Sequence, residues 1–455
     1  MKPFFKSSVS LGRGFFFGLL TVSVLQLFLS WFINYPPTEE QLPIILRLPT
    51  AHQLSFWLVK GASLALVLIS LVLFKRILEK FFEKKIAVLS SLVVFLSPTI
   101  YATWNLHPVD AVKVVVVMTI LWWGVSRGFR SLLIAGATIV VALLMLANNQ
   151  PLSNIPILNA MSPTAASAEI QDRLYSEASI VNLIHIPLAV KRIAYNKPYF
   201  IYKDVVGLFI SYADLESLFF QEVNSLGIKS FVLFFWPEII FLSIGFFYWA
   251  RDKNNQRRSF VALLVFISFV DFLLLNKPLY QQFLLTLFPL SVLVAIGIKK
   301  IARVPILGFL AVSILAFSVW VNYFDIAARP AFWFDNRPLV YRFIFDKLRT
   351  VGENSKQIRV TTLVGNSERY CEFYLGSCPP EKYKFDAFDL TATGPVAGTT
   401  YAGFLGEFIG KSIKNDFPSD WKDKFSLVGM TIEAEYQTRD TIAYHYGDIA
   451  VVAKK

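Results

Sequence analysis

The fold is decided by residues 45–110, which read ILRLPTAHQLSFWLVKGASLALVLISLVLFKRILEKFFEKKIAVLSSLVVFLSPTIYATWNLHPVD. This stretch contains a polar lead-in, an apolar run, a basic turn, a second apolar run and the polar ledge ATWNLHPVD. Two membrane crossings joined by a basic turn place Arg47-Leu48-Pro49 and the ledge on the same face of the bilayer, opposite the lysines. We therefore expect the chemistry of the protein at that face.

Composition predicts a membrane protein. The chain has 455 residues, of which 55% are hydrophobic and 43 are Phe, and its mean hydropathy is +0.52. A chain of this composition is too apolar to form a single soluble core. The net charge of +12 does not indicate nucleic-acid binding, because many Lys and Arg lie in short segments between apolar runs. Those residues are Lys2, Lys6, Arg13, Lys75, Arg76, Lys80, Lys84, Lys85, Arg127, Arg130, Arg251, Lys253, Arg257, Arg258, Lys299, Lys300 and Arg303.

The apolar runs predict about nine transmembrane helices in the plasma membrane. They are residues 14–33, 54–74, 86–101, 111–125, 131–147, 231–249, 259–276, 281–298 and 305–324. All the basic turns then face the cytoplasm, so the N-terminus is cytoplasmic and the C-terminus is extracytoplasmic. We interpret the first run as a retained span, since it is longer than the apolar part of a signal peptide. The basic turn after the second run is amphipathic and predicts a helix lying on the membrane surface.

Two segments lie outside these runs. Residues 148–230 form an outer insertion, in which apolar residues recur at helical spacing and predict amphipathic helices on the membrane surface. Residues 325–455 form a small extracytoplasmic α/β domain after the transmembrane domain of residues 1–324. Its expected elements are helices at 339–351 and 402–414, a strand at 357–364, and an antiparallel pair at 427–437 and 441–452.

The two cysteines, Cys371 and Cys378, both lie in this C-terminal domain. In an oxidising compartment they predict a disulfide that closes a short loop. The four His residues are scattered with no pair at ligand spacing, so we expect no metal site beyond a divalent cation near the carboxylates.

Ionisable residues inside the predicted spans indicate a polar pocket. They are Lys60, Asp110, Lys113, Glu238 and Asp271. Each lies nearer the outer end of its span, and a charge in the middle of a bilayer costs about 3 kcal/mol. Such residues therefore face a shared cavity or reach separately for the headgroups. The shared cavity is the favoured interpretation for Glu238 and Asp271, whose side chains are short.

The order of motifs resembles that of the polytopic GT-C glycosyltransferases, of the protein O-mannosyltransferase and aminoarabinose-transferase type. The matching residues are Arg47-Leu48-Pro49, Lys75-Arg76 and Leu96-Ser97-Pro98. The later stretch YQQFLLTLFPLSVLVAIG places Pro289 in register with a proline of that family. The resemblance covers about residues 14–325, and an outer C-terminal α/β domain agrees with it.

The resemblance implies sugar transfer from a polyprenyl-phosphate donor to a protein, lipid or glycan acceptor at the outer membrane face. A carboxylate deprotonates the acceptor hydroxyl, and cationic side chains stabilise the departing phosphate. The carboxylate candidates are Glu39 and Glu40, followed by Asp110. The candidate substrate-binding residues are Lys60, Lys113, Trp104, His107, Lys277 and Gln282.

Three positions differ from the family pattern. The first outer loop contains Glu39 and Glu40 but no Asp, Asn105 occupies a position that is usually Arg, and Gln282-Phe283 replaces Arg-Tyr. A non-catalytic scaffold subunit of an envelope complex is therefore an alternative. A transporter is a third hypothesis, but we see neither internal repeat symmetry nor charged or broken helices near the membrane midplane, which a transporter would need, and the polar residues cluster at one side.

Overall fold

The computed structural model describes residues 37, 41–47, 52–148, 157, 160–161, 197–213, 222–223, 228–229, 238–274, 283–310, 313, 316–317, 337–362, 365–388, 396–404, 433–437, 441–446 and 449–454. The chain divides into two compact units. One contains residues 1–29 and 62–329, and the other contains residues 30–61 and 330–455. The assignment of residues 1–324 and 325–455 to transmembrane and extracytoplasmic domains stays a prediction, because it concerns the position of a membrane.

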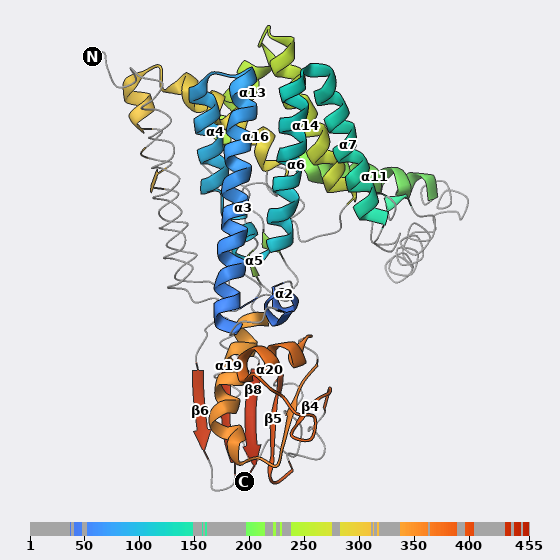
Figure 1. Ribbon diagram of the computed structural model, residues 1–455, viewed down its shortest axis with the longest axis vertical. Helices are drawn as coiled ribbons and strands as arrows, with labels where there is room; N and C mark the ends of the chain where they lie inside the picture. The colour runs from blue at the N-terminus through green and yellow to red at the C-terminus, as the bar shows by residue number, and fades with distance from the viewer. Residues whose placement is uncertain are drawn as a thin grey trace, which may run out of the picture. The chain divides into compact units, whose positions relative to one another are not determined.

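The first unit is helical (Figure 1). It contains most of α3 (His52–Phe81), then α4 (Lys84–Leu96), α5 (Pro98–Leu106), α6 (Pro108–Arg127), α7 (Phe129–Asn148), α11 (Lys197–Ala213), α13 (Glu238–Ala250), α14 (Asn255–Leu274) and α16 (Leu287–Ile301). Within it α16 packs against α4 and α13, and α7 packs against α6 and α14. The short strands β1 (Glu222–Val223) and β2 (Ile228–Lys229) pair antiparallel in the predicted outer insertion.

Among the residues that the structure describes, two helices are long and apolar enough to cross a membrane. They are residues Leu54–Phe81 of α3 and Pro108–Arg127, which is α6. A third crossing is counted if α4 and α5 form one bent span. Helices α7, α11, α13, α14 and α16 coincide with other segments predicted to be helical, whereas the predicted span at residues 14–33 lies outside the described residues.

The predicted span at 86–101 is bent. Helices α4 and α5 meet at an angle of 61°. Ser97 has extended backbone angles and its side chain accepts a hydrogen bond from the Thr99 amide at 3.2 Å. Pro98, which has no N–H and favours the first position of a helix, begins α5. The Ser-Pro pair therefore ends one helix and caps the next.

The surface-lying helix predicted for the basic turn is not observed as a separate element. Instead α3 continues without a break through Lys75 and Lys80 to Phe81, and Lys75 forms an ion pair with Glu79 at 2.7 Å along it. Residues 75–81 contain no glycine or proline that would end the helix after residue 74.

Glycine allows α13 and α16 to approach each other closely. A Cβ atom on Gly245 would lie 1.8 Å from the Leu293 carbonyl oxygen, and one on Gly297 would lie 2.0 Å from the Phe241 carbonyl oxygen. Small residues at the interface let two backbones touch, as in helix pairs packed within membranes. These two glycines therefore fix how the ends of α13 and α16 lie beside each other.

The second unit is built on a six-stranded sheet of order β4-β3-β5-β8-β7-β6. Its strands are β3 (Gln357–Val360), β4 (Tyr383–Phe385), β5 (Thr399–Phe404), β6 (Glu433–Gln437), β7 (Thr441–Tyr446) and β8 (Ile449–Lys454). Strand β3 is parallel to β4 and β5, and the remaining pairs are antiparallel. The helices are α19 (Arg337–Val351) and α20 (Ser367–Leu375), with the short 3-10 helix η3 (Gly352–Asn354) between α19 and β3.

An N-terminal segment belongs to the core of this second unit. Leu42 of α2 (Leu42–Arg47) is completely buried in the same cluster as Tyr341, Tyr370 and Val451. The Tyr370 hydroxyl donates a hydrogen bond to the Pro37 carbonyl oxygen at 3.0 Å, and its ring stacks on that of Tyr341. Pro37 and Leu42, which precede the first long helix, therefore pack with residues about 300 or more positions later.

Several predictions for this unit are confirmed and others are wrong. Helix α19 and strand β3 lie where they were predicted, although β3 ends earlier. The helix predicted at 402–414 is wrong at its start, because Ala402 lies in β5, a central strand paired on both sides. Pairing with β3 and β8 holds these residues in a strand. The spacing of apolar residues cannot distinguish such a strand from a helix when both faces of the strand are buried. The predicted strand at 441–452 is two strands, β7 and β8, paired so that Tyr446 lies opposite Ile449.

Candidate functional site

The structure describes five of the nine predicted catalytic and substrate-binding residues. Trp104, His107, Asp110 and Lys113 lie in the first unit, and Lys60 lies in the second. Glu39, Glu40, Lys277 and Gln282 lie outside the described residues.

The polar ledge forms a corner between two helices. Helix α5 ends at Leu106, and His107 follows, with its amide donating to the Thr103 carbonyl oxygen at 3.1 Å. Pro108 then begins α6, and both His107 and Asn105 are buried. The Trp104 ring is fully buried and packs edge-on against Tyr101, with ring centroids 5.4 Å apart. A sugar would reach this ring only if the corner opened.

Asp110 lies in the first turn of α6 and is 1% exposed. A carboxylate at this position interacts favourably with the partial positive charge of the helix N-terminus. The chain therefore holds an acidic side chain in an enclosed position at the start of a helix that is long enough to span a membrane.

Lys113 lies one turn after Asp110 and forms an ion pair with Asp271 of α14 at 2.6 Å. The Lys113 side chain is 10% exposed and the Asp271 side chain is fully buried. Removing two charges from water costs several kcal/mol per ion, which the attraction between them must offset. This pair joins α6 and α14 through two residues that are 158 positions apart in the sequence. It also brings together two of the five ionisable residues predicted to share a pocket.

Lys60 and Glu238, the other ionisable residues of the predicted spans, are also buried, at 1% and 3% exposure. The Lys60 ammonium lies 4.3 Å from the centroid of the Phe56 ring and 5.3 Å from that of Trp57. Both contacts are cation–π interactions within the second unit. Glu238 begins α13.

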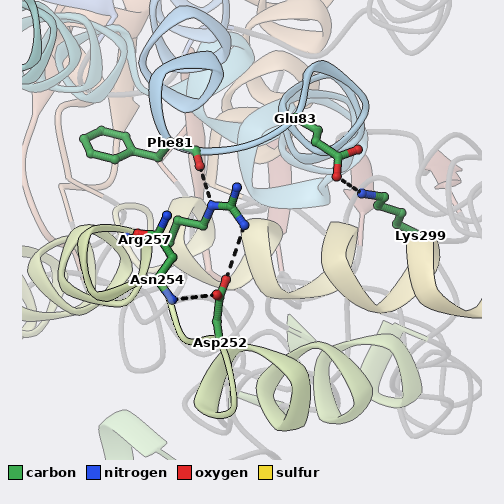
Figure 2. Close-up of polar contacts among 6 residues, drawn as sticks. All are labelled: Phe81, Glu83, Asp252, Asn254, Arg257 and Lys299. Carbon is green, nitrogen blue, oxygen red and sulfur yellow. Dashed lines mark hydrogen bonds and ion pairs between the residues drawn. The ribbon is translucent and has the colours of Figure 1, made fainter.

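A second polar group, which sequence reasoning did not identify as a site, lies where the end of α3, the end of α13, the start of α14 and the end of α16 meet (Figure 2). We call it the basic pocket. Its volume is about 390 Å³. It is lined by Arg251, Lys253, Arg257, Lys299, Lys300, Arg303, Glu83 and Asp252, together with Phe82, Ile86, Tyr248, Trp249 and Ile296.

Both carboxylates of the basic pocket are already bound (Figure 2). Glu83 forms an ion pair with Lys299 at 2.6 Å, and Asp252 forms one with Arg257 at 3.6 Å. The Arg257 guanidinium also donates to the Phe81 carbonyl oxygen at 2.7 Å, which ties α14 to the end of α3. The hydrogen bond from Lys299, helped by the charges of Lys299, Arg257 and Lys85, lowers the pKa of Glu83 against the opposing effect of burial.

An apolar pocket adjoins the basic one. Its volume is about 840 Å³, and it lies between α13, α14 and α16, with Tyr212 of α11 also in its lining. Trp249 lines both pockets. The Trp249 indole N–H is buried and has no hydrogen-bond partner among the described residues. Sequence reasoning assigned Lys299, Lys300 and Arg303 to membrane topology. Glu83 and Asp252, which lie within the basic segments of the sequence, were the signal that could have identified a site.

The described residues contain no group of three or more His, Cys, Asp or Glu side chains placed to hold a metal ion. Cys371 and Cys378 are joined by a disulfide, with their Cα atoms 6.2 Å apart. No protein-family model, curated protein or solved structure matches the chain.

Proposed function

We propose that the chain is a polytopic membrane glycosyltransferase that moves a sugar from a polyprenyl-phosphate donor to an acceptor hydroxyl at the outer membrane face. It crosses the plasma membrane about nine times, with the C-terminal α/β unit outside. The observation that carries the proposal is the buried Lys113–Asp271 ion pair, one helical turn from the buried Asp110. Ionisable residues inside membrane helices mark functional sites by default, because their burial is costly.

The three side chains have the chemistry that the transfer needs. Asp110 takes the proton of the acceptor hydroxyl, whose oxygen then attacks the anomeric carbon of the sugar. The bond from that carbon to the phosphate oxygen breaks, and the Lys113 ammonium stabilises the negative charge on the departing polyprenyl phosphate. Asp271 holds Lys113 in place before the donor binds. Glu39 and Glu40 are further candidates for the base.

The extracytoplasmic location of the α/β unit is supported by its disulfide. Disulfides persist in oxidising compartments and are rare in the cytosol. The basic residues at or just after the C-terminal ends of α3, α13 and α16 support the predicted orientation, because Lys and Arg near span ends are enriched on the cytoplasmic side.

The experiment measures transfer of radiolabelled hexose or pentose from undecaprenyl phosphate in membranes that contain the full chain. The Asp110→Asn variant is expected to lose most transfer while the protein accumulates normally. The Glu381→Gln variant is the matched control, since it neutralises an exposed carboxylate of the α/β unit and is expected to retain transfer.

A double variant separates a functional ion pair from a structural one. Replacing a buried ion pair by apolar side chains of similar size is often neutral for stability. Lys113→Met with Asp271→Leu is therefore expected to fold but to lose transfer. Full transfer by this double variant and by Asp110→Asn would contradict the proposal. A folded wild-type protein that transfers neither sugar, and that loses a co-purifying partner when residues 325–455 are deleted, would favour the scaffold.

A further inference from the structure

The basic pocket carries more positive charge than its own carboxylates can balance. It contains six cationic side chains and two carboxylates, and each carboxylate already has a cationic partner. In the part of the chain that the structure describes, Arg251, Lys253, Lys300 and Arg303 have no ion-pair partner. Cations gathered this closely repel one another unless an anion lies between them.

Lys300 also contacts an aromatic ring of the basic pocket. Its ammonium lies 4.1 Å from the centroid of the Tyr248 ring. Burial, followed by the charges of Arg303 and Lys299, lowers the pKa of Lys300, and the charges of Asp252 and Glu83 oppose the shift. A bound anion would favour the charged form of this lysine.

The two pockets together have the shape of a site for an amphiphile. Trp249 lines both the cationic pocket and the apolar one, and its buried indole N–H is a hydrogen-bond donor with no partner among the described residues. The apolar pocket is lined by Val261, Val265 and Phe269 of α14 and by Leu290 and Leu293 of α16. Its 840 Å³ is large enough for much of a hydrocarbon chain, and lipid tails are the solvent that apolar membrane helices encounter.

We propose that the basic pocket binds the phosphate of an anionic diacyl phospholipid, one acyl chain of which lies in the adjoining apolar pocket. Basic pockets between helices on the cytoplasmic side are suited to anionic headgroups, and the inner leaflet supplies them. Trp249 donates its N–H to a headgroup or ester oxygen, as indole rings at the membrane interface commonly do. This site is separate from Asp110 and Lys113 and does not depend on sugar transfer.

Native mass spectrometry of the delipidated full-length protein in detergent tests the site. The probes are dioleoyl-phosphatidylglycerol, dioleoyl-phosphatidylcholine and inorganic phosphate. The wild-type protein is expected to retain phosphatidylglycerol roughly tenfold more tightly than phosphatidylcholine. Equal retention of the two lipids would overturn the proposal, and this comparison requires no variant.

Two sets of variants locate the lipid. Lys300→Gln with Arg303→Gln is expected to weaken phosphatidylglycerol binding roughly tenfold. Arg127→Gln with Arg130→Gln removes the same charge from exposed positions outside the pocket and is expected to leave binding within about twofold. Equal losses in the two double variants would indicate general surface attraction and would overturn the site.

A substitution in the apolar pocket tests whether the bound phosphate belongs to a lipid or is free inorganic phosphate. Ala262→Trp fills part of that pocket and is expected to weaken phosphatidylglycerol binding. If Ala262→Trp has no effect and millimolar inorganic phosphate displaces the lipid, the pocket is a site for free phosphate and the lipid assignment is wrong.

Discussion

Gly245 of α13 lies directly against Gly297 of α16, since a Cβ atom on Gly245 would be 3.2 Å from the Gly297 amide nitrogen and 1.8 Å from the Leu293 carbonyl oxygen. The second distance is far shorter than any real contact of a Cβ atom. The two backbones therefore meet at a place where no side chain fits. The end of α16 supplies Lys299 and Lys300 to the basic pocket, and Arg251 directly follows α13.

The Gly245→Ala variant is expected to separate the two helices and to destabilise the protein by roughly 1–3 kcal/mol, because a backbone atom must move to admit the methyl group. Thermal unfolding of the purified protein in detergent measures the effect. Gly61→Ala is the matched control, since nothing lies within 4 Å of its added Cβ. Alanine is the better helix former, so the control is expected to be neutral or slightly stabilising. Equal stability of both variants would contradict the close packing of α13 and α16.

Removing one partner of the Lys113–Asp271 pair is expected to destabilise the protein by about 3–5 kcal/mol, because it leaves the other charge buried and uncompensated. Lys113→Ala and Asp271→Ala are therefore both expected to lower the midpoint of unfolding in a denaturing-detergent titration. The Lys113→Met and Asp271→Leu double variant is expected to recover most of that loss. If the loss of stability in the double variant equals the sum of the losses in the two single variants, the side chains do not act as a pair.

The ion pair between Glu83 and Lys299 predicts a small dependence of stability on pH. The folded protein lowers the pKa of Glu83, chiefly through the hydrogen bond from Lys299. The stabilisation is therefore complete above the ordinary glutamate pKa of about 4.3 and is lost as the pH falls through the lower folded-state value. The Glu83→Gln variant lacks this contribution at every pH.

Melting temperatures of wild-type protein and the Glu83→Gln variant are expected to differ at pH 6 and to converge as the pH falls below the ordinary glutamate pKa of about 4.3. The Glu83 side chain is 63% exposed, so the contribution is no more than about 1 kcal/mol and decreases in high salt. A difference that grows as the pH falls would have the opposite sign and would rule out this interaction as its cause.

Loss of the disulfide is expected to destabilise the α/β unit without affecting the helical unit directly. The bond closes a loop across a sequence separation of 7 residues, which corresponds to about 2–3 kcal/mol in the chain-entropy model. The Cys371→Ser and Cys378→Ser double variant is expected to show faster hydrogen exchange in α20, where Cys371 is buried. Mass spectrometry of freshly purified, alkylated wild-type protein without reduction should detect no labelled cysteine, and two labelled thiols would contradict the bond.

Local sequence patterns predicted the helices α6, α7 and α14 because their apolar runs end at charged or glycine-containing turns near Arg127, Gly128 and Arg251. They also predicted the disulfide, since two cysteines seven positions apart have few other roles. In contrast, Leu96-Ser97-Pro98 was interpreted as part of the family resemblance and not as a bend between two helices. The proline at the first position of α5 is the feature that should have indicated it.

Long-range contacts explain the remaining differences. Ala402 lies in a strand because β3 and β8 flank it, and neither neighbour is visible in the local sequence. The sequence predicted only that Lys113 and Asp271 are among five ionisable residues near one end of the spans. Their pairing depends on how α6 and α14 pack. The basic pocket was missed because each of its cations also has a sufficient explanation in membrane topology.

The hydrogen bond from Tyr370 to Pro37 has a consequence for biosynthesis. A ribosome makes Leu42 early, whereas Tyr341, Tyr370 and Val451, which share its core cluster, are made about 300 or more positions later. Leu42 is therefore not covered by these residues while the intervening helices are inserted and β8 is made. Nascent chains that end before β8 should remain sensitive to protease near Leu42, and protection should develop only once β8 has left the ribosome.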